Sequence, residues 1–192
     1  VKPAADMSGN RAEYEATAKE LRKLAQEGNV TAQNELGLLY KVGRGVSQSY
    51  GQAKKWFEEA AKQGHAEAQV NLGTLYLHGD APPQSAPMAL FWFSRAAEQG
   101  DVTAFSNLGV MYAQAQGVPQ DLIQAYMWFF LAATNGDENS AERCGVLAIK
   151  MTSAQIAEAQ ERAGAWKPTS KSLAWKPHRL SDTVLLTDMP PP

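Results

Sequence analysis

The chain has 192 residues, with 18 lysines and arginines against 20 aspartates and glutamates, and a formal net charge of −2 at pH 7. A charge this close to neutral leaves no electrostatic footprint for nucleic acid or an anionic membrane surface. The longest apolar run, residues 125–133, is too short to span a bilayer, and a single cysteine excludes an internal disulfide.

The N-terminal region predicts a leader followed by a capping helix. Residues 1–9 contain Pro3 and Gly9 and are expected to be flexible. Asn10, with Glu13 three residues later, has the spacing of a capping box, so a helix is expected from residue 10 to about 26. One face of this helix is charged, which is typical of a terminal helix with no neighbour outside it.

Three complete units of 36 residues follow, at 29–64, 65–100 and 101–136, and a shortened fourth unit occupies 137–166. The complete units align without insertion or deletion. Self-similarity at a fixed period of this length is the signature of a solenoid, in which each unit contacts only its neighbours. The sequence therefore predicts one continuous repeat domain over residues 10–166.

Helix starts and stops recur with the same period. A glycine closes each apolar run in a position suited to left-handed backbone, at Gly28, Gly64, Gly100 and Gly136. The residues that follow are Asn29, His65, Asp101 and Asp137, of which all but the histidine are good N-caps. The second helix of each complete unit is expected to begin at Ser49, Ser85 or Asp121, with Gln52 and Gln124 in capping-box position.

Large and small side chains alternate in columns that predict the core. The columns are Leu36, Leu72 and Leu108; Tyr40, Tyr76 and Tyr112; Trp56, Trp92 and Trp128; and Phe57, Phe93 and Phe129. Such alternation lets facing helices interdigitate at native packing density. Glycine also recurs inside the first helix, at positions 37, 73, 109 and 145, where it costs about 1 kcal/mol relative to alanine. We therefore expect close approach of a second helix at all four glycines.

The fourth unit is expected to end the solenoid. Cys144 occupies the leucine column and is interpreted as a small buried hydrophobe and not as a reactive thiol. Thr152 with Gln155 has capping-box spacing, and a helix without the tryptophan–phenylalanine pair is expected from residue 153 to about 163. The apolar pair Phe130 and Leu131 in the preceding unit suits a terminus that folds back over it.

The tail, residues 167–192, is rich in proline, serine and lysine and has no helical period. Residues 165–168 recur as residues 174–177. Two interpretations stay open. The tail is disordered, or it is an extended peptide whose Trp175 and residues 184–186 dock on a groove of this chain or of a second copy, which would make it a route to self-association.

The repeated pattern A-x-x-x-L-G-x-x-Y, then G-x-G-V, then A-x-x-W-F-x-x-A-A-x-x-G resembles the Sel1-like repeat family, which is related to tetratricopeptide repeats. The second unit departs from it, with residues 81–83 in place of the second glycine and valine. The resemblance implies an all-α, right-handed superhelical solenoid of α/α helix pairs with capping helices at both ends. It also implies that the first helix of each pair lines the inner surface.

Residues that carry chemistry are few. The three histidines lie in different parts of the chain, without metal-site spacing, and no phosphate-binding loop or nucleophile motif is present. No catalytic residue, metal site or cofactor is therefore predicted. Because the aromatic columns follow the core period and lack basic partners, we interpret them as packing.

The predicted function is a non-enzymatic adaptor that binds a peptide or helix of another protein in its concave groove. The predicted contact residues are the inward positions outside the core columns: Asn34, Leu38, Lys41, Val70, Thr74, Leu77, His78, Ser106, Val110, Ala113 and Gln114. Equivalent inward positions are Val42 in the first unit and Glu142, Val146, Ile149 and Lys150 in the fourth. No nucleic-acid partner is expected.

Two other functions stay open. A module that binds envelope glycan or peptidoglycan would need exposed aromatics beyond the core, for which Tyr50 and Phe91 are candidates. A hydrolase would need His78 beside an acidic residue in a closed pocket. A first residue other than methionine and the habit of the family favour a periplasmic or secreted location, with the cytoplasm as the alternative.

Overall fold

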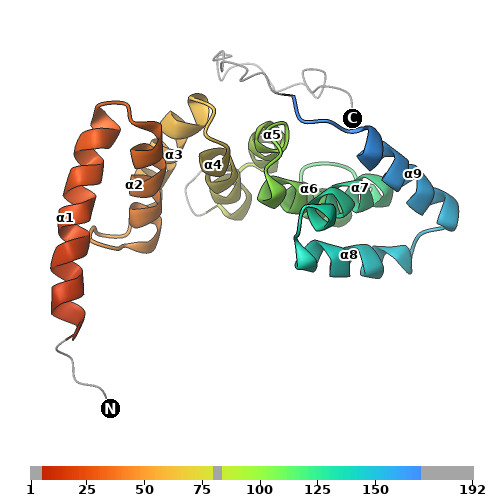
Figure 1. Ribbon diagram of the computed structural model, residues 1–192, viewed down its shortest axis with the longest axis horizontal. Coiled ribbons are helices and arrows are strands. Elements are labelled where there is room, and N and C mark those ends of the chain that lie inside the picture. The colour runs from red at the N-terminus through yellow and green to blue at the C-terminus, as the bar shows by residue number, and fades with distance from the viewer. Residues whose placement is uncertain (1–5, 80–83, 170–192) are drawn as a thin grey trace.

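The computed structural model describes residues 6–79 and 84–169, which form nine α-helices and no strand. The helices are α1 (Asp6–Gln26), α2 (Val30–Val42), α3 (Tyr50–Lys62), α4 (Ala66–His78), α5 (Ala86–Ala97), α6 (Val102–Gln114), α7 (Leu122–Thr134), α8 (Glu138–Ala148) and α9 (Ser153–Ala165). They follow one another along the long axis, from α1 at one end to α8 and α9 at the other (Figure 1). The expected all-α repeat architecture is confirmed.

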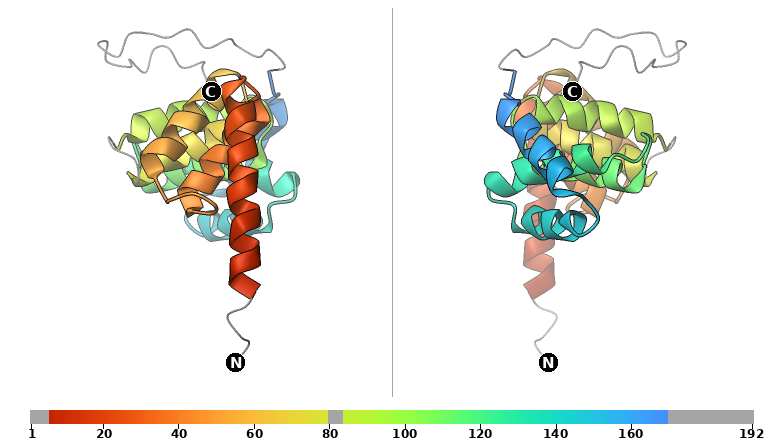
Figure 2. Two further views of the ribbon diagram at one scale, coloured as in Figure 1. Left: turned by 90° about the vertical axis from the view of Figure 1, so that its left-hand side faces the viewer. Right: turned by 90° about the vertical axis from the view of Figure 1, so that its right-hand side faces the viewer.

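The helices pack in consecutive pairs. Within the pairs, α2 packs on α3, α4 on α5 and α6 on α7, while α3 meets α4 and α5 meets α6 between pairs. At the ends, α1 packs on α2, and both α8 and α9 pack on α7. End-on views show the helices of successive pairs crossing the long axis in different directions (Figure 2). The core is therefore a continuous layer along the stack and not a single centre.

Three of the first helices begin with the side-chain caps that their sequence allows. Asn29 and Asp101 accept the backbone N–H of the residue three positions later, at 2.9 and 2.8 Å. His65 does the same through its Nδ1 at 3.3 Å, although histidine was the one residue not expected to cap well. Asp137 was expected to cap and makes no side-chain cap bond. Its carboxylate instead accepts the hydroxyl of Ser140.

The other predicted helix starts are confirmed, but the capping boxes expected with Gln52 and Gln124 are not formed, because the N–H groups of Ser49 and Asp121 donate to the carbonyls of Tyr40 and Tyr112. Ser49, Ser85 and Asp121 each cap the second helix of their pair. The four glycines at the ends of the units have φ between 85° and 97°, the left-handed region that glycine adopts without steric cost. Thr152 and Gln155 form a reciprocal capping box at the start of α9. Cap chemistry alone therefore fixes most helix starts in this chain.

The first helix differs from its prediction. α1 begins at Asp6 and not at Asn10, so Asn10 lies inside the helix and cannot cap it. Residues 6–9 of the predicted leader are helical, and its residues 1–5 lie outside the described part of the chain. The physical reason is that good helix formers follow from Arg11 onward, and adding a residue to an existing helix costs far less than nucleating one.

Glycines inside the first helices permit the close packing of each pair. A Cβ atom built on Gly37, Gly73 or Gly109 would lie 2.5 to 2.7 Å from the ring of the phenylalanine that follows it by 20 residues. The prediction is wrong at Gly145, where a Cβ would meet nothing within 4 Å. The phenylalanine column ends at Phe129, and α9 packs on α7, so no ring faces Gly145.

The predicted core columns are buried, and burial is greatest in the middle of the stack. The three phenylalanines of the column are at most 3% exposed. Trp92 and Tyr76 of the second unit are also buried, whereas Trp56, Trp128, Tyr40 and Tyr112 are half-buried. α9 packs on α7 and leaves Leu131 only 9% exposed, so the expected return of the chain over this helix is confirmed.

One helix end holds strained backbone. The left-handed residue after the first helix is Gly43 in α2 and Gly79 in α4, but it is Ala115 in α6, with φ of 57°. A side chain in this region costs about 1 kcal/mol relative to glycine. We expect Ala115→Gly to raise the melting temperature by about 2–4 °C in thermal denaturation followed by circular dichroism.

A matched substitution separates this effect from a general effect of glycine. Ala113→Gly places glycine two residues earlier, inside α6, and is expected to cost about 1 kcal/mol. A lower melting temperature for Ala115→Gly would show that the backbone at this turn is not strained.

Candidate functional site

The predicted contact residues lie on α2, α4 and α6, and those in the N-terminal halves of these helices are buried or hydrogen-bonded within the chain. Asn34 and Val70 are 1% and 8% exposed. The side-chain oxygen of Asn34 accepts a hydrogen bond from the amide of Asn71 at 3.2 Å, which joins α2 to α4. Asn34 therefore helps to hold adjacent helix pairs together, and a partner cannot reach either residue in this conformation.

Ser106 takes part in a hydrogen-bond network that joins α6 to α8. The hydroxyl oxygens of Ser106 and Ser140 lie 3.0 Å apart, and the Arg143 guanidinium donates to Ser106 at 3.3 Å. The hydroxyl of Ser140 donates to Asp137, and this bond lowers the pKa of the Asp137 carboxyl against the opposing effect of burial. Ser106 is thus already hydrogen-bonded within the chain.

The C-terminal halves of the first helices present the accessible part of the predicted surface. Leu38, Lys41, Thr74, Leu77, Val110 and Ala113 are half-buried there, and His78 and Gln114 are exposed. The large hydrophobic side chains that stand exposed in the described residues are Val42 at 60%, Val146 at 59% and Ile149 at 86%. We call the following twelve residues the inner stripe: Leu38, Lys41, Val42, Thr74, Leu77, His78, Val110, Ala113, Gln114, Val146, Ile149 and Lys150.

All three exposed hydrophobic side chains lie at predicted inward positions. Val42 ends α2, Val146 lies in the last turn of α8, and Ile149 follows α8 directly. They recur at the C-terminal ends of first helices, one at the beginning of the stack and two near its end. The three side chains belong to three different columns of the repeat, and all of them lie in or directly after the C-terminal half of a first helix.

A family model described as "Sel1 repeat" matches residues 30–65, 66–101 and 106–137, which together cover more than half of the chain. The chain belongs to the Sel1 repeat family. A search of curated proteins found no match. Among solved structures, a Sel1 repeat protein from Oxalobacter formigenes is similar, with 29% sequence identity, a TM-score of 0.66 and coverage of 79% of this chain and 64% of that one.

A protective antigen of uropathogenic Escherichia coli strains with an SLR fold is also similar. It is 28% identical, with a TM-score of 0.59, and the match covers 77% of this chain. The chain matches 64% and 40% of the lengths of these two structures. Sel1 repeats are in general modules for protein–protein interaction, and membership of this family therefore supports a role in protein binding.

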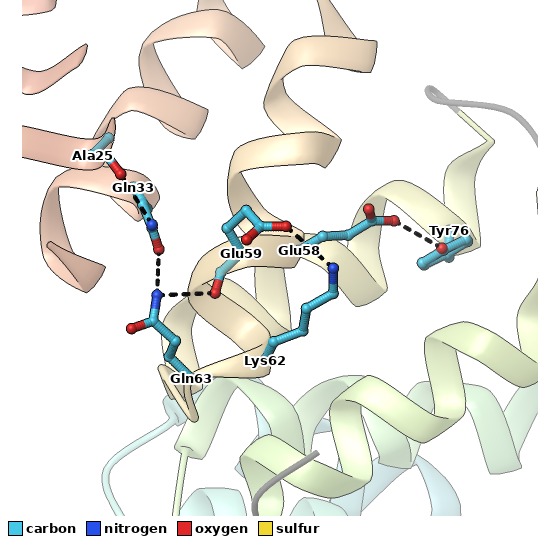
Figure 3. A network of polar contacts seen from close by, with 7 residues as sticks. All are labelled: Ala25, Gln33, Glu58, Glu59, Lys62, Gln63 and Tyr76. Carbon is cyan, nitrogen blue, oxygen red and sulfur yellow. Dashed lines mark hydrogen bonds and ion pairs between the residues drawn. The ribbon is translucent and has the colours of Figure 1, made fainter. Parts of the chain in front are cut away.

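The first two Sel1 repeats each hold a glutamine pair that the sequence did not predict, and the first glutamine of each pair bonds to the preceding helix. The amide of Gln33 donates to the carbonyl of Ala25 at 3.1 Å, and the amide of Gln63 donates to the side chain of Gln33 at 2.8 Å (Figure 3). Gln69 and Gln99 repeat the arrangement one period later. Recurrence of glutamine at a fixed spacing was the available signal, and these side chains bind within the protein.

The tyrosine column of the Sel1 repeats ends in two different polar contacts. The Tyr76 hydroxyl donates to Glu58 at 3.2 Å (Figure 3), and burial together with this carboxylate raises the pKa of Tyr76 to about 12. At the equivalent place in the preceding unit the residue is Arg22, which donates to the Tyr40 hydroxyl oxygen at 3.0 Å. The tyrosine is the donor in one pair and the acceptor in the other.

The chemistry-bearing residues are placed separately along the stack. His65 caps α4 and His78 is exposed in its last turn, while His178 lies outside the described residues. Cys144 is 8% exposed, and burial raises the pKa of its thiol to about 11, which disfavours the reactive thiolate. In residues 6–79 and 84–169 no three metal-ligating side chains come close enough to hold an ion.

The aromatic side chains considered for glycan binding are engaged in contacts of their own. Phe91 meets Trp92 edge-on with ring centroids 5.0 Å apart, and the Arg95 guanidinium lies 5.5 Å from its centroid. Tyr50 is half-buried, and its hydroxyl accepts from Gln48 at 3.3 Å. The tail residues around Trp175 lie outside the described part. Within that part, no helix has the length and apolarity to cross a membrane.

Proposed function

We propose that this Sel1 repeat chain is a non-enzymatic adaptor that binds a peptide or helix of another protein along the inner stripe. The observation that carries the proposal is the exposure of Val42, Val146 and Ile149, at three positions that the sequence predicts to face inward. Exposed apolar side chains gain free energy when a partner covers them, about 25 cal/mol for each Å² removed from water.

The division of the first helices supports this location. Their N-terminal halves are tied to neighbouring helices through Asn34 and Ser106. The predicted contact residues that remain accessible lie in the C-terminal halves, and they differ from unit to unit while the core columns recur. A surface that varies on a constant scaffold suits selective recognition, because it can change without cost to packing.

The proposal predicts that selection from a phage-displayed library of random 12-residue peptides will enrich sequences that bind this chain. Val42→Asp with Ile149→Asp is expected to lower their retention more than tenfold, because both side chains are largely exposed and an aspartate there would be buried by the peptide. Titration of a selected synthetic peptide by fluorescence polarisation measures the change.

The matched control is Gln52→Asp with Gln160→Asp, which adds the same charge at exposed positions of α3 and α9. This control should bind the peptide as the unaltered chain does. Equal binding by the Val42→Asp, Ile149→Asp variant, or a selection that enriches nothing, would contradict the proposal.

A further inference from the structure

An open pocket of about 760 Å³ lies at the N-terminal end of the stack, between α1 and the turn that joins α2 to α3. The side chains that line it include Arg11, Glu15 and Arg22 from α1, Tyr40 from α2, and Ser47 and Ser49 from the turn. Its volume is within the range of pockets that bind small ligands, about 300–1,000 Å³. The inner stripe does not line it.

The pocket exists because α1 is longer than the helices that occupy its place in later units. α1 has 21 residues and α3 has 13, and the extra N-terminal turns run past α2 (Figure 1). The turn packs tightly against α1 at the residue that follows this extension, since a Cβ on Gly45 would collide with the backbone of Tyr14. Arg44 also lies 4.8 Å from the centre of the Tyr14 ring. The two walls are therefore held in place.

The polar groups of the pocket are mainly hydrogen-bond donors. Because the Tyr40 oxygen accepts from Arg22, the Tyr40 hydroxyl hydrogen remains free to donate to another group. The Ser49 oxygen likewise accepts the backbone N–H of Gln52 at 3.3 Å, which leaves its own hydrogen to donate. One unit later, Glu58 stands in the position of Arg22 and accepts the hydrogen bond of Tyr76. The arginine donor is therefore a feature of the contact between α1 and α2.

The net charge of the side chains that line the pocket would balance one negative charge on a ligand. Arg11 and Glu15 form an ion pair at 2.9 Å and compensate each other. Arg22 is half-buried, and the hydrogen-bond partner that the structure gives it is the neutral Tyr40 hydroxyl. The three charged side chains leave a net charge of +1. A second negative charge on the ligand would be repelled by Glu15 without a cation to balance it.

We propose that this pocket binds a single carboxylate of a polypeptide ligand, with Arg22 as the charged anchor and Tyr40 and Ser49 as hydrogen-bond donors. A carboxylate has one charge and two acceptor oxygens, and a guanidinium holds it through two parallel bonds. The carboxylate comes from an acidic side chain or from a chain end. This site is separate from the inner stripe and does not depend on it.

The experiment is an NMR titration of the full chain, following its backbone amide and arginine Nε–H signals. The probes are N-acetylglutamate amide for a side-chain carboxylate, N-acetylalanine for a chain end, and N-acetylglutamine amide as the neutral match. We expect saturable shifts at Arg22, Ser47 and Ser49 with one or both acids and none with the neutral compound. The acid that binds more tightly identifies the source of the carboxylate.

Substitutions then test the assigned roles. Arg22→Gln is expected to weaken binding about tenfold or more, since it removes a charge-assisted hydrogen bond. Tyr40→Phe removes one hydroxyl and should weaken binding severalfold without disturbing the fold. Lys23→Gln makes the same charge change at the next, exposed position of α1 and should have no effect. The Val42→Asp, Ile149→Asp variant should also keep the shifts, which separates this site from the inner stripe.

Three results would overturn the proposal. They are the absence of saturable shifts with either acid, equal shifts with the neutral amide, and unchanged binding by both Arg22→Gln and Tyr40→Phe. Tighter binding of inorganic phosphate than of either acid would overturn the assignment to a carboxylate.

Discussion

Gly73→Ala is expected to lower the free energy of unfolding by about 1–3 kcal/mol, although alanine is the better helix former. A Cβ at this position would lie 2.7 Å from Cε1 of Phe93. The ring cannot move aside cheaply, because Phe93 is fully buried. The steric cost therefore exceeds the gain in helix propensity, which is about 1 kcal/mol. Urea denaturation followed by circular dichroism measures the difference.

Gly145→Ala is the matched control, since it makes the same change in the same column. No atom lies within 4 Å of its Cβ, so only the propensity gain remains and stability should rise by about 1 kcal/mol. Combining Gly73→Ala with Phe93→Leu should lose less than the sum of the single changes, because the smaller side chain relieves the contact. A shift in the same direction for both alanine variants would refute the account of the glycine column.

Trp166→Ala is expected to cost about 3 kcal/mol at the C-terminal end of the stack. Trp166 follows α9 directly, and its ring meets Phe105 of α6 and Trp128 of α7 edge-on at centroid distances of 5.0 and 5.9 Å. It thereby fastens the end of α9 to two helices of the preceding unit. Loss of the indole removes both aromatic contacts and opens a gap beside them.

Hydrogen exchange read by mass spectrometry tests where this loss is felt. Exchange should rise in α6 to α9, which Trp166 contacts or follows, and stay unchanged in α2 to α4, because each unit of a solenoid contacts only its neighbours. Trp166→Phe keeps an aromatic edge and should recover much of the protection. Faster exchange along the whole chain would mean that the stack unfolds as one unit.

The repeat period was a reliable guide wherever the structure depends on neighbours along the chain. The caps at Asn29, Ser49 and Thr152 and the left-handed glycines lie where the sequence placed them. These features depend on bonds that span three or four residues. The start of α1 was misplaced because a helix that forms from Arg11 onward extends towards the N-terminus through Asn10 to Asp6.

The period failed where units differ in their partners. Gly145 is the glycine of its column in the fourth unit, but no phenylalanine ring packs against it as in the first three units. Asp137 keeps the cap position, but its carboxylate accepts from Ser140. Asn34 and Ser106 were expected to face a partner and instead bind adjacent helices. Periodicity reports which positions are equivalent, and it does not report what each side chain meets.

The sequence by itself determined the all-α repeat fold, most helix boundaries and the membership of the core columns, because all of these follow from local spacing repeated at a fixed period. Only the tertiary structure decided which of the predicted contact residues stay accessible, and that α1 forms a donor-rich pocket through Arg22 beside Tyr40. Exposure and hydrogen-bond direction depend on distances between helices, and a pattern along one chain does not contain those distances.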